Sequence, residues 1–270
     1  VATIRDYTTR IAREMHVVGL MNIQFAVKDG VVFILEVNPR ASRTAPFVSK
    51  ATGVPLPRLA TQVMLGKTLK ELDPWSMRRS GYVSVKESVF PFRRFPGVDI
   101  LLGPEMRSTG EVMDVGRSFG EALFKSQLGA DSAIPKSGRV FISVKEEDKP
   151  RLPQLAKNFT EAGYQLVATR GTAKVIREAG YRCDVVNKVS EGRPNIVDEL
   201  KNGNIQLVIA VAAESRSEIA DASAIRIASL ANHVTFYTAM ANALAVIEGI
   251  RHMKDTEVYA QQELHKHLQH

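Results

Sequence analysis

From Arg139 onward, short apolar runs alternate with segments in which apolar residues recur at helical spacing. Strands are predicted for the apolar runs at 139–144, 164–169, 183–187, 206–211 and 233–238. Helices are predicted for the segments between and after them, at 149–162, 172–179, 195–202, 217–231 and 239–253. Regular alternation of apolar strands with helices predicts an α/β fold: a doubly wound, five-stranded parallel sheet covered on both faces.

The N-terminal part of the chain predicts an α+β arrangement around a hairpin. Two β-rich runs, 19–27 and 31–37, flank Lys28-Asp29-Gly30, and the Asp-Gly pair favours a tight turn. The flanking segments are predicted as helices at 4–15 and 57–66 and as a loop at 38–47.

The middle of the chain is punctuated by prolines, with a strand predicted at 82–90 and a helix at 118–127. Residues 129–138, rich in Gly, Ala, Ser and Pro, form the best linker candidate. We therefore expect three domains, which cover 1–66, 67–130 and 131–270. The polar segment 253–270 contains three histidines and is predicted to be a loosely held, solvated helix rather than a metal site.

Composition narrows the classes of partner. Lys and Arg number 36 and Asp and Glu 29, a formal net charge of +7, which favours anionic ligands such as phosphates. The basic residues are scattered, without an arginine-rich run or an aromatic stripe, which argues against nucleic-acid binding. Apolar runs are too short for a membrane span. The single cysteine, Cys183, indicates a reducing cytoplasm and a buried structural role.

The hairpin carries a candidate metal site. Because side chains alternate along a strand, Glu36 and Asn38 point to one side, and pairing across the turn would place Gln24 beside them. One carboxylate with amide oxygens suits Mg²⁺, which keeps waters and phosphate oxygens as its other ligands. Arg40 and Arg43 follow and are placed to contact phosphates. The alternative is an ordinary hairpin with a polar face.

Residues 19–56 (GLMNIQFAVKDGVVFILEVNPRASRTAPFVSKATGVPL) closely resemble the end of an ATP-grasp domain in the carbamoyl phosphate synthetase large subunit. The resemblance implies that Gln24, Glu36 and Asn38 bind Mg²⁺ (or Mn²⁺) ions bridging ATP phosphates. It also implies that Arg40 and Arg43 stabilise the transferred phosphate. The implied partners are the remainder of the large subunit and a glutaminase small subunit. The implied reaction forms carbamoyl phosphate from bicarbonate, ammonia and ATP, for arginine and pyrimidine biosynthesis.

Residues 82–113 (YVSVKESVFPFRRFPGVDILLGPEMRSTGEVM) resemble the family's segment after its second ATP-grasp unit. Lys86 and Glu87 correspond to its VKE motif, whose Glu lies near a site for the activator ornithine. Glu87 is equally well interpreted as a surface or interface carboxylate. The chain lacks the glycine-rich loop and basic residues that an ATP-grasp site needs upstream, and no GxxxxGK[ST] replaces them, so we expect the isolated chain to be inactive.

A phosphate-binding cluster is expected at the carboxyl ends of the later strands. Ser143 and Lys149 follow the first strand, and Lys188 follows the third. Thr169-Arg170-Gly171-Thr172 is predicted as the turn after the second strand, where hydroxyls and a helix N-terminus favour phosphate. The alternative is that Thr172 is simply a helix N-cap.

This C-terminal part resembles the methylglyoxal synthase-like (MGS-like) domain that ends carbamoyl phosphate synthetases, on the strings ATRGT and NKVSEGRPNIVDELKNG. The resemblance implies regulatory UMP or IMP bound through five contact residues: Ser143, Lys149, Thr169, Thr172 and Lys188. The family commonly has Asn-Thr-Thr after the fourth strand, but this chain has Ala210-Val211-Ala212. The loss of two hydrogen bonds predicts nucleotide affinity lower by about one to two orders of magnitude.

A second departure concerns ornithine, because Tyr237 stands where an Asp precedes the Thr matched by Thr238. Three functional interpretations remain: part of a ligase, a nucleotide-sensing module without catalysis, and a free-standing lyase of the methylglyoxal synthase type. The lyase needs a carboxylate base, for which Asp148 and Glu214 are the nearest candidates. The N-terminal resemblance disfavours the lyase. A homo-oligomer is compatible with each of these interpretations.

Overall fold

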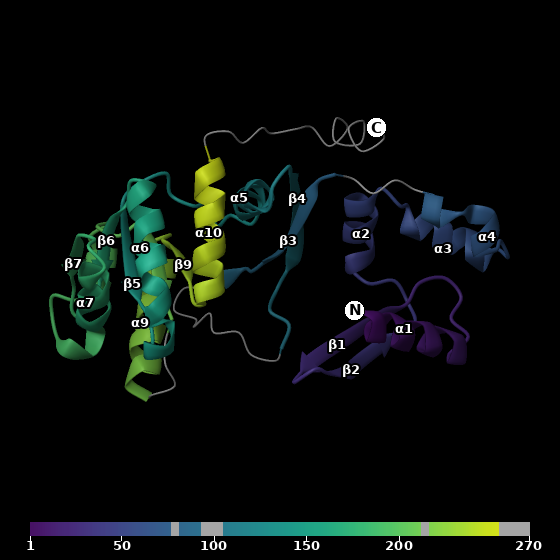
Figure 1. The fold of residues 1–270 in the computed structure, drawn as a ribbon, viewed down its shortest axis with the longest axis horizontal. Coiled ribbons are helices and arrows are strands. Elements are labelled where there is room, and N and C mark those ends of the chain that lie inside the picture. The colour runs from purple at the N-terminus through teal and green to yellow at the C-terminus, as the bar shows by residue number, and fades with distance from the viewer. Residues whose placement is uncertain (77–80, 93–104, 212–215, 254–270) are drawn as a thin grey trace. The chain divides into compact units, whose positions relative to one another are not determined.

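The computed structural model describes residues 1–76, 81–92, 105–211 and 216–253 (Figure 1). The chain divides into two compact units, one of residues 1–82 and one beginning at Val83. Each unit is described by itself. The tail helix predicted at 253–270 lies outside the described residues from residue 254 onward. Within the described residues, every helix is too short or too polar to span a lipid bilayer.

The first unit contains the predicted hairpin. Strands β1 (Asn22–Lys28) and β2 (Val31–Asn38) pair antiparallel after helix α1 (Ala2–Glu14). Asp29 and Gly30 both have positive φ, 51° and 78°, which is the geometry that makes Asp-Gly a favoured hairpin turn. The hairpin prediction is therefore confirmed.

Helices follow the hairpin: α2 (Thr44–Thr52), α3 (Leu56–Met64) and α4 (Leu69–Leu72), with a 3₁₀ turn at Pro74–Ser76. The loop predicted at 38–47 is wrong from Thr44 onward, because α2 begins there. Gly53, at φ 74°, ends α2 in the left-handed conformation that favours glycine.

The second unit opens with an antiparallel pair, β3 (Val83–Val89) and β4 (Gly110–Gly116), followed by α5 (Phe119–Gly129). Helix α5 contacts both strands and packs closely on α10 (Met240–His252), the last helix in the described residues. Gly120 makes this approach possible, since a Cβ there would lie 2.4 Å from the Glu248 carbonyl oxygen. Strand β4 had not been predicted from the sequence.

The predicted parallel sheet is confirmed. Its five strands pair in the order β7-β6-β5-β8-β9, all parallel. They are β5 (Arg139–Ser143), β6 (Gln165–Ala168), β7 (Cys183–Val185), β8 (Leu207–Ala210) and β9 (Thr235–Tyr237). The strand order reverses between β5 and β8, because β5 is followed by β6 on one side and β8 by β9 on the other. In open α/β sheets, ligands bind at the carboxyl ends of the strands at such a point.

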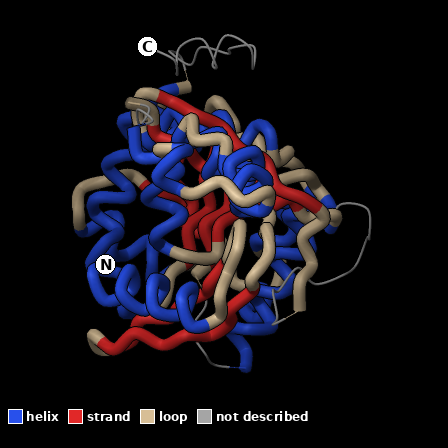
Figure 2. Tube along the Cα trace, turned by 90° about the vertical axis from the view of Figure 1, so that its right-hand side faces the viewer, coloured by secondary structure: helices blue, strands red, loops and turns tan. Residues whose placement is uncertain are grey.

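Helices cover both faces of this sheet; Figure 2 draws its strands in red and the helices in blue. Alternate residues of β5 point to opposite faces: Val140 and Ile142 join one buried cluster, and Phe141 joins the other. The first cluster packs under α6 (Leu152–Glu161), α7 (Arg170–Glu178) and α10; the second packs under α8 (Ile196–Lys201) and α9 (Arg216–Ala231).

Candidate functional site

Three hydroxyl side chains meet at the carboxyl ends of β5 and β6. The oxygen of Ser143 lies 3.4 Å from Thr169 Oγ1, which lies 3.4 Å from Thr172 Oγ1. The backbone N–H of Val144 donates to Thr172 Oγ1 at 3.4 Å. Thr169 and Thr172 are buried and Ser143 is half-buried. The structure therefore brings together the three hydroxyls that the sequence singled out.

The first turn of α7 forms the floor of this cluster. The N-cap is Thr169, with no side-chain cap hydrogen bond, and Thr172 lies inside the first turn. The interpretation of Thr172 as an N-cap is therefore wrong, as is that of 169–172 as a turn outside the helix. The first N–H groups of a helix have no partner within it and carry partial positive charge. They favour an anion here.

Lys149 lies beside the first turn of α7, and Lys188 follows the next strand, β7. Lys149, in a 3₁₀ turn at Glu146–Arg151, places Nζ 3.6 Å from where a Cβ on Gly171 would stand, and it pairs with Glu146. Lys188, at the start of a second 3₁₀ turn, has Nζ 3.6 Å from a carboxylate oxygen of Glu218 on α9. Each cation therefore has a carboxylate partner within the protein.

The sequence reasoning missed a carboxylate that holds the Lys188 loop. Asp221 of α9 accepts hydrogen bonds from the Ser190 backbone N–H at 3.1 Å and from its hydroxyl at 2.7 Å. Asp221 and Ser190 are 31 residues apart, and no motif in either segment signals the contact. The loop that presents Lys188 is thus tied to α9.

The end of β8 is apolar at this edge. Ala210 is buried and the backbone N–H of Val211 donates to the Ser143 carbonyl. Ala212 and the lyase candidate Glu214 lie outside the described residues, and Asp148 lies in the 3₁₀ turn that carries Lys149. Of the segment 210–212, Ala210 and Val211 are described, and both of these side chains are apolar.

The hairpin brings together the predicted metal ligands. Gln24 lies directly opposite Glu36, so their side chains share one face of the ribbon. The Asn38 amide donates to Glu36, which places all three together. Asn22, paired with Asn38, lies on the same face and was missed, although two-residue alternation from Gln24 indicates it.

These residues fit a hard cation such as Mg²⁺ that keeps water or phosphate oxygens, because they supply one carboxylate and amide oxygens. Within the described residues no group of three or more His, Cys, Asp and Glu gathers, so amide oxygens are needed to complete any such site. Arg40 is exposed, and its guanidinium donates to the Ala41 carbonyl. Arg43 is exposed at the N-cap of α2.

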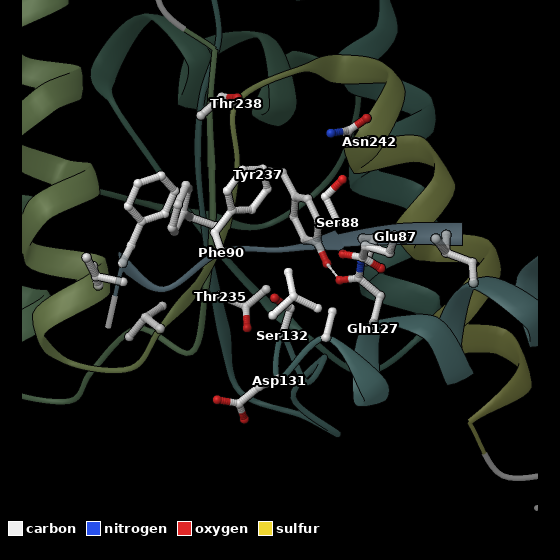
Figure 3. A pocket seen from close by; sticks show the side chains of 18 of the residues that line it. Glu87, Ser88, Phe90, Gln127, Asp131, Ser132, Thr235, Tyr237, Thr238 and Asn242 are labelled. Carbon is white, nitrogen blue, oxygen red and sulfur yellow. Dashed lines mark hydrogen bonds between the residues drawn. The ribbon is translucent and has the colours of Figure 1, made fainter. Parts of the chain in front are cut away.

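A pocket of about 1070 Å³ lies in the second unit, between the β3–β4–α5 layer and the β9–α10 edge of the sheet (Figure 3). Glu87 and Thr238, the two residues expected at the ornithine site, both line it. The Glu87 carboxylate accepts from Gln127 Nε2 at 2.6 Å and from the Ser126 hydroxyl at 3.1 Å. The Tyr237 hydroxyl donates to Gln127 Oε1 at 2.7 Å.

Burial is the main cause of the pKa shifts of Glu87 and Tyr237. Burial raises the pKa of the Glu87 carboxyl above its ordinary value, while the hydrogen bonds from Gln127 and Ser126 oppose that shift. Burial also raises the pKa of Tyr237, and the nearby Glu87 charge adds to it. Tyr237 is therefore a neutral hydroxyl and a hydrogen-bond donor at physiological pH.

Comparison with known proteins gives two family matches. "Carbamoyl-phosphate synthase L chain, ATP binding domain" matches residues 1–72, and "MGS-like domain" matches residues 151–238. The first match covers the hairpin, and the second covers Thr169, Thr172 and Lys188.

Curated relatives align along nearly the whole chain. The "Carbamoyl phosphate synthase large chain" of Ralstonia nicotianae is 52% identical over 269 residues, 98% of this chain and 25% of the relative. Its counterpart in Pasteurella multocida is 52% identical over 265 residues, with the same two shares. That of Myxococcus xanthus is 49% identical over 258 residues, 96% of this chain and 24% of the relative. The chain spans about a quarter of the length of these relatives.

The described architecture agrees with these matches: β6, β7, β8 and β9 of the all-parallel sheet lie within the residues that the MGS-like model matches, and the hairpin of β1 and β2 lies within those that the ATP-binding model matches. The chain therefore belongs to the carbamoyl phosphate synthase large-chain family and contains part of its ATP-binding domain followed by its MGS-like domain.

Proposed function

We propose that the MGS-like domain of this chain is a regulatory site that binds the phosphate of a nucleoside monophosphate such as UMP or IMP. The cluster of Ser143, Thr169 and Thr172 hydroxyls at the N-terminus of α7 carries this proposal. Hydroxyls donate to phosphate oxygens, and the helix N-terminus favours negative charge. Gly171 leaves room for close backbone approach, and Lys149 beside it supplies a cation.

We further propose that this regulation acts on carbamoyl phosphate synthesis by a longer protein that includes the remainder of the large subunit. In it, Gln24, Glu36 and Asn38 would hold Mg²⁺ or Mn²⁺, which neutralises charge on the ATP phosphates. Arg40 and Arg43, exposed beside the hairpin, would orient and stabilise the transferred phosphate. A glutaminase small subunit would supply ammonia, in the cytoplasm, for arginine and pyrimidine synthesis.

The isolated chain itself is expected not to turn over ATP, because it contains no segment that would enclose the nucleotide. Incubation of the purified chain with ATP, Mg²⁺, bicarbonate and ammonia should yield no carbamoyl phosphate. Production of carbamoyl phosphate by the chain alone would contradict this part of the proposal.

Calorimetric titration with UMP and with IMP, in the presence of Mg²⁺, tests the regulatory site. Lys149→Ala should weaken binding by about ten-fold or more, since a hydrogen bond to a charged group contributes roughly 1.5–3 kcal/mol. Lys174→Ala removes an exposed lysine from the outer side of the same helix, α7, where it faces Glu178 at 3.8 Å, and is the matched control. Absence of binding at millimolar nucleotide, or an equal loss in the control, would overturn the proposal.

A further inference from the structure

The loop after β7 is shaped by hydrogen bonds between residues that are close in sequence. Lys188 precedes the 3₁₀ turn Val189–Glu191, and its backbone N–H donates to the Glu191 carboxylate at 2.9 Å. Further along, the Asn195 backbone N–H donates to Asp198 of α8 at 2.9 Å. Each contact joins residues three apart in the chain. Neither reaches the half of the sheet that lies beyond β5.

Asp221 supplies a long-range contact to the same loop. It lies on α9, which follows β8, and it accepts from both the backbone N–H (3.1 Å) and the hydroxyl (2.7 Å) of Ser190. Hydrogen bonds to an ionised group are stronger than neutral ones. Strands β7 and β8 are separated in the sheet by β6 and β5. The Asp221 carboxylate therefore joins the two halves of the sheet across the point where the strand order reverses.

The position of this loop decides what Lys188 can reach. A lysine ammonium sits on a flexible four-carbon stem, so it is directed to a ligand only where its backbone is held. The N–H of Val186 donates to the Ala168 carbonyl at 3.0 Å, so β7 ends beside the residue that precedes Thr169. Lys188, two residues further on, lies at the sheet edge that carries the hydroxyl cluster.

Glu218 acts on the same loop in a different way. It lies three residues before Asp221, on the same face of α9, and one of its carboxylate oxygens lies 3.6 Å from Lys188 Nζ. Glu218 therefore pairs with the ammonium that a phosphate would use. Asp221 instead binds the backbone and hydroxyl of Ser190, which leaves the ammonium to other partners.

We propose that Asp221 is a positioning residue, which through Ser190 holds the loop so that Lys188 is directed to the proposed phosphate site. This inference rests on the proposed function, because it names a residue that acts on that site through Lys188. When a phosphate binds, Lys188 leaves Glu218, while the contact between Asp221 and Ser190 stays in place. Coulomb repulsion alone predicts that loss of any nearby carboxylate strengthens anion binding. The positioning role predicts the reverse for Asp221.

The sign of the change in UMP affinity separates these two effects. Titration calorimetry of the 270-residue chain should show UMP binding about ten-fold weaker in Asp221→Ala, because two charge-assisted hydrogen bonds are lost. Glu218→Gln removes the same charge three residues away and should bind UMP about two- to five-fold more tightly. Asp221→Asn keeps an oxygen that can accept from the Ser190 N–H and should lose less affinity than Asp221→Ala. Unchanged or tighter binding of UMP to Asp221→Ala would overturn the proposal.

A double-mutant cycle tests whether Asp221 acts through Lys188. In a Lys188→Ala background, Asp221→Ala should cause no further loss of UMP affinity, because no ammonium remains to be directed. An equal loss in both backgrounds would also overturn the proposal. The control is Glu161→Ala on α6, which removes an exposed carboxylate 3.8 Å from Lys157 and should leave UMP affinity unchanged. A loss in this control as large as in Asp221→Ala would count against a specific role.

Hydrogen exchange measures the hold on the loop without any ligand. Mass spectrometry of the segment 187–195 should show several-fold faster exchange in Asp221→Ala than in the unaltered chain, and unchanged exchange in Glu218→Gln. Unchanged exchange in Asp221→Ala would overturn the proposal, whatever the affinity for UMP. If the unaltered chain binds no UMP, the proposed function fails, and hydrogen exchange alone decides whether Asp221 holds this loop. Thermal unfolding of each variant establishes that it is folded.

Discussion

The ammonium group of Lys188 lies 3.6 Å from a carboxylate oxygen of Glu218, so one cation of the proposed phosphate site already has a counter-ion on α9. Both side chains are about one-third exposed, so solvent and ligands can reach the pair. An incoming phosphate must compete with Glu218 for Lys188. The carboxylate therefore lowers the affinity of the site for anions.

Removing this competitor should strengthen nucleotide binding. Glu218→Gln is expected to raise UMP affinity by about two- to five-fold, because exposed ion pairs contribute no more than about 1 kcal/mol. The gain should shrink at high salt, since added ions screen exposed charges. Titration calorimetry at low and high salt measures both effects. The control is Glu178→Gln, which removes one negative charge from the outer part of α7 and should leave the affinity for UMP unchanged.

Glu87 should make stability depend on pH. Burial raises the pKa of this carboxyl in the folded protein above its ordinary value of 4.5. At pH values between 4.5 and the pKa of the folded state, the folded protein therefore binds more protons than the unfolded chain. The free energy of unfolding therefore falls as pH rises through this window, and the ionised carboxylate lowers stability at neutral pH. Glu87→Gln should unfold at higher urea concentration than the unaltered chain at neutral pH, and the advantage should vanish in mild acid.

Glutamine at position 87 keeps the hydrogen-bonding capacity of the glutamate without its charge. A glutamine at 87 can still accept from Gln127 and can donate to the Ser126 hydroxyl, whose own hydrogen can then be donated to the Leu123 carbonyl oxygen, 2.8 Å away. Hydrogen bonds are thus retained while the buried charge is lost. A stability advantage that persists undiminished in acid would show that the charge is not its cause.

Cys183 should be unreactive in the folded chain. Burial raises the pKa of its thiol to about 11 from 9.0; the Asp184 charge adds to the shift, and Arg177 opposes it. The thiolate, which is the reactive form, is then roughly a hundred-fold less populated at mildly alkaline pH. Alkylation by iodoacetamide, followed by mass spectrometry, should be slow in buffer and fast in urea. Rapid labelling of the folded chain would contradict the buried assignment.

The contact between α5 and α10 should depend on Gly120. An alanine there would place Cβ 2.4 Å from the Glu248 carbonyl oxygen, so the helices would have to separate. Gly120→Ala is expected to lower the free energy of unfolding by about 1–3 kcal/mol, the usual cost of overpacking. Gly129→Ala, at the end of the same helix, meets its nearest atom at 3.5 Å and should be tolerated. Urea unfolding of both variants distinguishes a steric effect from a general one.

Much of the fold could be predicted because its signals are local. The Asp29-Gly30 turn places Gln24 opposite Glu36, and the apolar runs after Arg139 became the five parallel strands. Strand β4 and helix α2 were not recognised. β4 was not predicted because the segment before it is rich in proline. α2 was not predicted because Arg40 to Pro46 contain residue types that are common in loops.

By itself, the sequence determined the hairpin, the alternation of strands and helices, and the placement of hydroxyls at strand ends, because each depends on neighbouring residues and backbone geometry. Only the tertiary structure decided that Lys188 pairs with Glu218, that Asp221 holds Ser190, and that Tyr237 orients Gln127 toward Glu87. These contacts join segments 30 or more residues apart. Periodicity along the chain contains no information about which distant side chains meet, since that depends on strand order and helix packing.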